Sequence, residues 1–392
     1  MIKQLQDIIP QFSNELQLLI LLSQQYINKA ELEKIETLEK LVDWKLFFEL
    51  SRKHRLLSHV VKQINKHPDI IESEIKKQLT DQQKALSKKA LLYSRYLTKI
   101  HQALKEKSIP HVFFKGPLLS LELYNDIGFR DYRDIDLLVP LNHIEKARIT
   151  IQDLGFGMHA PNKQLSNKQK KINYTISHHY HLKKQGLPIE IELHWNLTNP
   201  KTYFPLETKK IIEEPAYIEI GNLKLPYIPK IANISFLAAH GSIHQWYRLF
   251  WLKDFSEIIR QSKDEKIQDA WLLSQKYKLE KTFIQACMLS SLLYKSPVPA
   301  FLRKRSFPDS LIQYGLNAIG SKDLRQHGIV GKINFIGYRL KLKPDFNYYA
   351  SLIVRLRTHY TDWEILPLPG YLFFLYYFLR PFFLIYKFIS KK

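Results

Sequence analysis

The sequence predicts an α+β protein in which a small mixed β-sheet is flanked along the chain by two helical lobes. Residues 1–105 show helical periodicity, with Leu and Ile three and four positions apart between charged residues. From Ile109 the sequence pattern changes to short apolar runs that alternate with helical segments. Helical patterns resume from about Lys230. The predicted boundaries are an N-terminal helical lobe at 1–105, a sheet-containing core at 106–228 and a C-terminal helical lobe at 229–392.

Length and composition limit the class of protein. A chain of 392 residues is long enough to form more than one compact lobe. The net charge of +22, from 59 basic and 37 acidic residues, predicts attraction to polyanions, which include nucleotides, nucleic acids and anionic membrane surfaces. The single cysteine, Cys287, excludes an internal disulfide framework, and no secretory signal pattern opens the sequence. We therefore expect a cytoplasmic protein.

Short apolar runs mark the strands of the predicted core. HVFF at 111–114, DIDLLVP at 134–140 and IEIELHW at 189–195 have the length and composition of strands. The segment 216–228 reads as a hairpin, with Gly221 and Asn222 at the turn. Together these segments predict a small mixed sheet.

Two aspartates in the second of these strands predict a metal site. Side chains alternate between the faces of a strand, so Asp134 and Asp136 point the same way, roughly 6 to 7 Å apart along the backbone. Two carboxylates so placed repel each other unless a cation neutralises them. Divalent cations bind such pairs and support phosphoryl-type displacement. We expect Mg²⁺ here, with Mn²⁺ as the alternative.

A possible phosphate-binding turn precedes the aspartates. Gly116 allows the backbone to approach a phosphate closely, Lys115 carries a compact positive charge, and Pro117 suits the first turn of a following helix. The alternative is a plain strand-to-helix turn with a solvated lysine. Arg130 and Arg133 flank the turn into the aspartate strand, where a guanidinium could clamp a triphosphate bidentately or balance nearby acids such as Asp131.

A third acid is predicted in IEIELHW. Glu190, Glu192 and His194 share one face of that strand, and a carboxylate there could complete the metal shell or deprotonate an acceptor. His194 is then a candidate residue of the substrate cleft. The alternative is an edge strand with a solvated polar face.

Histidines gather shortly before that strand. His178, His179 and His181 do not have the spacing of a known zinc site, and Cys287 is not near them in sequence. We interpret them as residues at the rim of the cleft that contact substrate.

A later helical segment supplies two further cleft candidates. His240 and His244 are four positions apart, which places them on one helical face, but no Glu follows His240 as a zinc-protease motif requires. Asp254 is expected to orient a cleft histidine or an arginine such as Arg248. The alternative for Asp254 is an ordinary surface acid.

The C-terminal tail, LPLPGYLFFLYYFLRPFFLIYKFISKK, is densely aromatic. Arg380 and Pro381 are expected to split it into apolar runs that are well short of the roughly 20 residues needed to span a bilayer. Flanking lysines, among them Lys391 and Lys392, suit an interfacial helix on an anionic membrane surface. The alternative is a tail that packs back onto the helical lobe.

The order and spacing of these motifs resemble the nucleotidyltransferase superfamily, and most closely an uncharacterised nucleotidyltransferase family found in bacteria. The resemblance runs from about Trp44 to the Arg380-Pro381 pair. Better-known superfamily members carry a Gly-Ser pair about ten residues before the first aspartate, and this chain has Lys115-Gly116 instead. The segments that match the family are Phe113-Phe114-Lys115-Gly116, Tyr124, Arg130, the 134–139 run DIDLLV, the 189–195 run IEIELHW and the 237–259 helical segment.

The resemblance implies a polymerase-beta-like core and a metal-dependent enzyme. Asp134, Asp136 and Glu192 would form the acid set on Mg²⁺, and Lys115, Gly116 and Arg130 would hold the triphosphate of ATP or another nucleoside triphosphate. His194, His240 and Asp254 would line the substrate cleft. The expected reaction transfers a nucleotidyl group to an acceptor and releases pyrophosphate. A small molecule such as a sugar phosphate, a protein side chain and an RNA end all stay open as acceptors.

A rival hypothesis from another class is a catalytically inactive binding module of the same fold. Such a module would dock on nucleic acid, or on the inner face of a membrane, through its basic surface and aromatic tail. The presence of all three candidate acids favours the enzyme.

Overall fold

A computed structural model describes residues 11–305, 307–321, 329–354 and 356–389. The first ten residues of the predicted N-terminal lobe and the terminal Lys391 and Lys392 lie outside the described residues. The chain divides into two compact units, each made of separate stretches of sequence. Unit 1 comprises Met1–Tyr96, Lys115–Tyr132 and Pro229–Lys343, and unit 2 comprises Leu97–Phe114, Arg133–Ile228 and Pro344–Lys392.

Unit 1 is built from helices. Several begin at residues whose side chains accept hydrogen bonds from the first helical turn, such as Ser13, Asn28 and Asp43. Its helices are α2 (Asn14–Leu22), α3 (Lys29–Glu39), α4 (Trp44–His54), α5 (Leu57–Lys66), the first part of α6 (Ser73–Glu106), α7 (Gly116–Tyr124), α11 (Lys230–Ile243), α12 (Leu249–Arg260), α13 (Asp264–Lys276), α14 (Glu280–Tyr294), α15 (Asp309–Gly320) and α16 (Ile329–Leu342).

The early and late helices of unit 1 share one hydrophobic core. Leu18 and Phe47 from the first hundred residues are buried in the same cluster as Trp246 and Phe283. Burial of apolar faces against each other explains why these distant segments fall in one unit. The predicted lobes are three consecutive segments instead, because the sequence pattern does not show which helical faces pack together.

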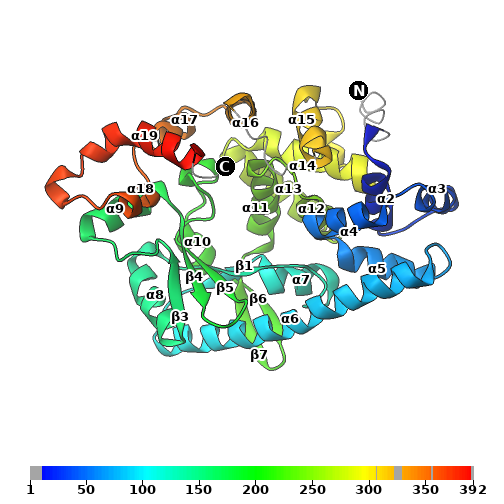
Figure 1. Cartoon of the computed structure of the whole chain (residues 1–392), viewed down its shortest axis with the longest axis horizontal. Helices are drawn as coiled ribbons and strands as arrows, with labels where there is room; N and C mark the ends of the chain where they lie inside the picture. Colours follow the sequence, from blue (N-terminus) through cyan, green and yellow to red (C-terminus); the bar gives the residue numbers. More distant parts are fainter. Residues whose placement is uncertain (1–10, 306, 322–328, 355, 390–392) are drawn as a thin grey trace. The chain divides into compact units, whose positions relative to one another are not determined.

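Unit 2 contains a mixed sheet, which Figure 1 shows as arrows. Its seven strands have the order β3-β4-β5-β2-β1-β7-β6. Strand β1 pairs in parallel with β7 and β2 in parallel with β5, while the other neighbours are antiparallel. The predicted α+β class with a small mixed sheet is therefore confirmed. The strands are β1 (Val112–Phe114), β2 (Asp134–Leu138), β3 (Phe156–Ala160), β4 (His179–Lys184), β5 (Glu190–His194), β6 (Ala216–Ile220) and β7 (Leu223–Tyr227).

The hairpin and the three core strands expected from the sequence are present. Strands β6 and β7 pair on either side of Gly221, whose φ of +58° suits a residue without a Cβ. The structure also contains strands β3 and β4, which the sequence patterns did not predict. The polar run that forms β4 lies next to β5, so β5 is an interior strand and not an edge strand.

The remaining elements of unit 2 include helices and short 3-10 turns. The turns are Leu141–His143, Lys201–Tyr203 and Gly370–Leu372, and unit 1 has one at Ala300–Leu302. The helices are the end of α6, α8 (Ile144–Asp153), α9 (Asn167–Ile176), α10 (Thr208–Glu213), α17 (Phe346–Val354), α18 (Tyr360–Ile365) and α19 (Leu375–Ile389).

Part of the aromatic tail, Leu375–Ile389, forms one helix, α19, which runs through Pro381. Pro381 therefore separates the apolar runs in the sequence without ending the helix. Proline removes one backbone hydrogen bond, but burial of Tyr376 and Phe383 and an ion pair between Arg380 and Asp362 hold the segment. The buried side of the tail packs on Ile176 and other residues of unit 2.

The other side of the tail is exposed, as Phe378 and Phe382 show with exposed fractions of 70% and 65%. Within the part of the chain that the structure describes, no helix is both long enough and apolar enough to cross a membrane.

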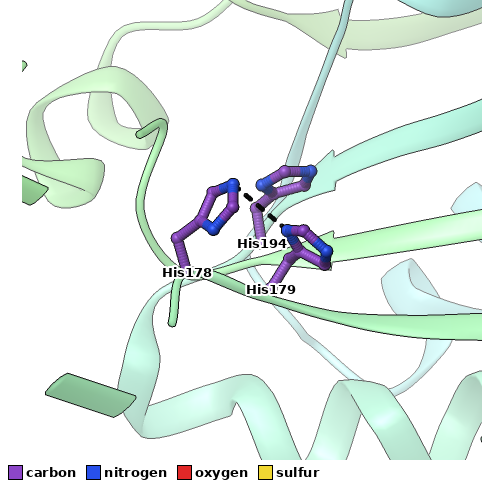
Figure 2. A group of neighbouring side chains, drawn as sticks. All are labelled: His178, His179 and His194. Carbon is purple, nitrogen blue, oxygen red and sulfur yellow. Dashed lines mark hydrogen bonds between the residues drawn. The ribbon is translucent and has the colours of Figure 1, made fainter. Parts of the chain in front are cut away.

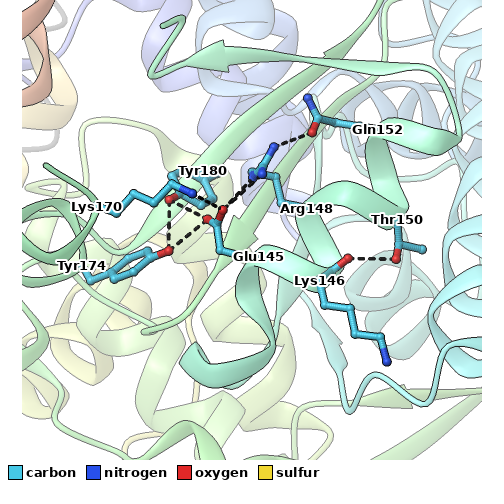
Figure 3. Close-up of polar contacts among 8 residues, drawn as sticks. All are labelled: Glu145, Lys146, Arg148, Thr150, Gln152, Lys170, Tyr174 and Tyr180. Carbon is cyan, nitrogen blue, oxygen red and sulfur yellow. Dashed lines mark hydrogen bonds and ion pairs between the residues drawn. The ribbon is translucent and has the colours of Figure 1, made fainter. Parts of the chain in front are cut away.

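A polar cluster joins α8 to α9 and β4 around Glu145 (Figure 3). Its carboxylate accepts hydrogen bonds from the hydroxyls of Tyr174 at 2.9 Å and Tyr180 at 3.0 Å. Lys170 and Arg148 pair with it at 2.7 and 3.1 Å. Burial alone would raise the pKa of Glu145, but these partners outweigh burial and lower the pKa to about 2.

Replacing Glu145 by Gln is therefore expected to destabilise the protein in a pH-dependent way. Because the folded-state pKa lies below the unfolded one, the contribution is complete above about pH 4.5 and is lost as the pH falls toward 2. After allowance for partial exposure we expect a loss of about 1 to 2 kcal/mol at pH 7. Urea unfolding at pH 7, 5 and 3 measures the effect.

The matched control for Glu145 is Glu219→Gln, which removes an exposed acid that pairs with Lys224 at 3.5 Å. This variant should stay within about 0.5 kcal/mol of wild type at every pH. An equal loss from Glu145→Gln at pH 7 and pH 3 would contradict the account.

Candidate functional site

The central strands of unit 2 bring carboxylates together. Strands β2 and β5 run in parallel, with Asp134 opposite Glu190 and Asp136 opposite Glu192. Every second residue of a strand points to the same face, and paired residues of neighbouring strands share that face. All four acids therefore lie on the same side of the sheet.

Asp136, Glu192 and His194 form the closest group on this face. One potential ligand atom from each lies within 4.8 Å of the others. His194 Nε2 lies 3.1 Å from Glu192 Oε2 and 3.2 Å from Asp136 Oδ1. The side chains of Asp136 and His194 are almost fully buried, whereas that of Glu192 is 26% exposed.

The imidazole of His194 is held by these acids. Burial alone would lower its pKa, but the hydrogen bonds and charges of Asp136 and Glu192 outweigh burial and raise the pKa. The ring therefore donates from Nε2 toward the carboxylates and partly neutralises them. The Phe114 ring also contacts His194, at a centroid distance of 4.9 Å in an edge-on arrangement.

Asp134 starts β2 and is half-buried on the same face. Among the described residues, the group of ligand atoms around His194 contains Asp136 and Glu192 but not Asp134. The other acid of that group is Glu192 on the neighbouring strand. Both carboxylates are among the acids predicted from the sequence.

The predicted phosphate-binding turn lies at the start of α7 in unit 1. Lys115 is the residue before the helix, and Pro117 stands in its first turn as expected. Lys115 has φ +53° and ψ −144°, and Gly116 has φ +47°. Glycine adopts such conformations readily, whereas a lysine held there stores about 1 to 3 kcal/mol of strain. Strain of this kind is common at ligand-binding turns.

Arg130 anchors this turn from within unit 1. Its Nη1 donates to the carbonyl of Gly116 at 3.0 Å. Its Nη2 and Nε donate to Asp254 at 2.7 and 3.0 Å, in a pair whose side chains are only 6% and 2% exposed. Tyr124 adds a third donor to Asp254 at 3.0 Å. Burial raises the pKa of Asp254, and the contacts from Arg130 and Tyr124 oppose that effect.

Asp254 orients an arginine, as expected, but the arginine is the buried Arg130 and not Arg248, so Asp254 is not an ordinary surface acid. The guanidinium of Arg130 bonds Asp254 and the Gly116 carbonyl. Arg130 thus fixes the position of the turn.

His240 lies near the end of α11 in unit 1, in an aromatic group. Its ring contacts those of His244 and Trp251 at centroid distances of 4.7 and 5.6 Å, and His244 stacks on Trp251 at 4.8 Å.

Arg133 is the first residue of the unit 2 stretch Arg133–Ile228, and it is exposed.

The candidate residues thus fall into two sets, each described within its own unit. Unit 1 holds Lys115, Gly116, Arg130, His240 and Asp254, and unit 2 holds Asp134, Asp136, Glu192 and His194.

The structure also joins His178 and His179 to His194, which sequence reasoning did not do. His179 lies opposite His194 in the antiparallel pairing of β4 and β5. Figure 2 shows the three imidazole rings turned toward one another. A hairpin turn near Gly186 would have predicted this group, because the antiparallel register that follows from it puts residue 179 opposite residue 194.

Comparison with known proteins identifies a family. A model of an uncharacterised nucleotidyltransferase family matches residues 40–295, which is well over half of the chain. The matched region includes every candidate residue described above. No curated protein matches the chain.

Proposed function

The chain belongs to the uncharacterised nucleotidyltransferase family, and we propose that it transfers a nucleotidyl group from a nucleoside triphosphate to an acceptor in a reaction that depends on Mg²⁺ or Mn²⁺. The family assignment supports nucleotidyl transfer in general, while the metal, the nucleotide and the acceptor are our proposals. ATP is the first nucleotide to test.

The observation that carries this proposal is the pairing of Asp136 with Glu192 across parallel strands, beside Asp134 on the same face. Carboxylate oxygens are the ligands that Mg²⁺ and Mn²⁺ prefer. A buried carboxylate such as Asp136 needs a positive charge near it, and in the protein alone the His194 ring supplies part of that charge. The acids therefore fit a divalent cation, which Asp134, Asp136 and Glu192 would hold.

The cation, Glu192 and His194 would have distinct roles in this reaction. A bound divalent cation would supply charge neutralisation at the phosphate and would polarise the attacking oxygen. Glu192, which is more exposed than Asp136, would accept the proton of the acceptor hydroxyl. His194 orients Asp136 and Glu192 through Nε2.

The turn before α7 is proposed to bind the triphosphate. Lys115 contributes charge, and Gly116 gives close access to backbone N–H groups at the start of the helix. Arg130 acts as a positioning residue because it holds the Gly116 carbonyl.

Replacing Lys115 by Gly is expected to move stability and binding in opposite directions. Glycine relieves the backbone strain, so the free energy of unfolding should rise by about 1 kcal/mol. Loss of the ammonium should weaken triphosphate binding by about tenfold. Urea unfolding and a triphosphate titration measure the two effects.

Lys115→Ala is the matched control, because it removes the charge but keeps a Cβ at positive φ. It should weaken binding without the gain in stability. A Lys115→Gly protein that is less stable than wild type, or that binds triphosphate as tightly, contradicts the assignment of this turn.

The test of the proposed function is a thermal-shift screen with each nucleoside triphosphate, with and without Mg²⁺. Wild type is compared with Asp134→Asn/Asp136→Asn and with a control of equal charge change, Asp153→Asn/Glu219→Gln, which removes two exposed acids of unit 2. We expect Mg²⁺-dependent stabilisation by at least one triphosphate in wild type and in the control. The shift should vanish in the Asp134/Asp136 variant.

The screen also identifies the preferred base and so guides the search for the acceptor, a small molecule, a protein or an RNA in the cytoplasm. Equal shifts in wild type and in the Asp134/Asp136 variant would reject the carboxylates as the metal site. No shift with any triphosphate would favour the inactive binding module.

The exposed side of α19 supports a second proposal, that the tail makes peripheral contact with an anionic membrane surface. Exposed aromatic residues on one helix of a protein with net charge +22 suit such a surface. The protein should sediment with vesicles that contain phosphatidylserine, and Phe378→Asp/Phe382→Asp should reduce this binding. Phe346→Asp, on the exposed part of α17, should leave it unchanged. Equal sedimentation of all three proteins would argue against the tail.

A further inference from the structure

Three histidines of unit 2 meet at one edge of the proposed active-site face. His178 immediately precedes β4, His179 begins β4, and His194 ends β5. The cross-strand pairing of His179 with His194 fixes their backbones. A hydrogen bond of 2.9 Å from Trp195 N to the carbonyl of His178 fixes the third position. The three imidazoles are therefore placed by the sheet.

The spacing of the rings fits a single small cation. His178 Nε2 and His179 Nδ1 are 3.1 Å apart, and Zn–N bonds of 2.0 to 2.1 Å imply about 3.3 Å between two nitrogens of a tetrahedral site. All three histidines offer a nitrogen within 4.8 Å of the other two.

His194 has the hydrogen-bonding pattern of a metal-ligating histidine. Its Nε2 faces Asp136 and Glu192. Its Nδ1 is buried and has no hydrogen-bond partner among the residues that the structure describes. Ligating histidines commonly hold a carboxylate with one ring nitrogen and a metal with the other. Nδ1 is thus the nitrogen available for a cation on the side of His178 and His179 (Figure 2).

We propose that His178, His179 and His194 form a binding site for a transition-metal ion, with Zn²⁺ as its preferred occupant. Imidazole nitrogens suit Zn²⁺ and its neighbours, whereas Mg²⁺ selects oxygen. Three protein ligands leave a fourth position open for water or a substrate atom. This site differs from the Asp134, Asp136 and Glu192 set proposed for Mg²⁺, and it does not depend on nucleotidyl transfer.

Titration of the full-length protein with Zn²⁺, without nucleotide or Mg²⁺, tests the site. A competing chromophoric chelator gives the affinity and stoichiometry, and the visible spectrum with Co²⁺ reports nitrogen coordination. The variants are His178→Gln and His179→Gln, both at half-buried positions. The matched control is His181→Gln, which alters the same strand but removes a histidine that pairs with Glu190 at 3.0 Å. Circular dichroism establishes that each variant is folded.

We expect one equivalent of Zn²⁺ to bind wild type and the His181 variant with similar affinity. Loss of either His178 or His179 should weaken binding by about 100-fold and remove the Co²⁺ absorption bands. The proposal is overturned if wild type binds no stoichiometric Zn²⁺, or if both test variants bind it as wild type does. In the latter case the cation occupies Asp136, Glu192 and His194 instead. The titration contains neither nucleotide nor Mg²⁺, so its failure is distinguishable from failure of the proposed function.

Discussion

Asp136→Asn is expected to lower the rate of pyrophosphate release from a nucleoside triphosphate by about a thousandfold or more, equivalent to about 4 kcal/mol of transition-state stabilisation. Asp136 is the most buried acid of the set and contacts His194. The amide has the same shape but no negative charge, so it neither holds a divalent cation well nor keeps the donor of His194 paired with a charge. Release is measured with Mg²⁺ and with water as the acceptor.

The matched control is Asp153→Asn, an exposed acid of unit 2 that pairs with Lys107 on the surface. This variant should retain the wild-type rate. Urea unfolding of both variants separates loss of chemistry from loss of fold. A folded Asp136→Asn protein that releases pyrophosphate at more than a tenth of the wild-type rate would falsify the role given to Asp136.

Asp254→Asn is expected to destabilise the protein by about 3 to 5 kcal/mol. The substitution leaves the Arg130 guanidinium, only 6% exposed, without its counter-charge. It also weakens the acceptor for the Tyr124 hydroxyl. Removal of one partner from a buried pair costs far more than removal of one from a surface pair. The free energy of unfolding in urea is the measurement.

Two further proteins sharpen this test. Asp81→Asn breaks an exposed pair with Lys84 in the same unit and should cost no more than about 0.5 kcal/mol. Arg130→Met/Asp254→Leu replaces both buried partners by apolar side chains and should be more stable than Asp254→Asn alone. A double variant that is no more stable than Asp254→Asn would show that the two residues do not act as a pair.

Local patterns predicted the core of the sheet because alternation and turn residues are properties of short segments. The strand of Asp136 and the hairpin at Gly221 are of this kind. Strand β4 was missed because histidines and lysines interrupt its apolar positions, and these polar residues are tolerated since one face of the strand carries the site. Which helices share a core could not be predicted, because Phe47 and Phe283 meet only through packing.

The acids of the site were predicted from strand alternation, but the partners of two other residues were not. Arg130 and Asp254 are 124 positions apart, so no local pattern joins them. His194 reaches His178 and His179 through a strand pairing whose register depends on the turn at Gly186. Long-range contacts of this kind explain why the partners of Arg130 and of the histidines could not be predicted from local patterns.

The position of bond formation tests the account most directly. Wild type is incubated with Mg²⁺ and the triphosphate selected by the thermal-shift screen in ¹⁸O-labelled water, and the products are analysed by ³¹P NMR and mass spectrometry. Attack at the α phosphorus, as nucleotidyl transfer requires, places the label in the nucleoside monophosphate and yields unlabelled pyrophosphate. Label in inorganic phosphate, accompanied by a nucleoside diphosphate, would show attack at the γ phosphorus and contradict the proposed reaction.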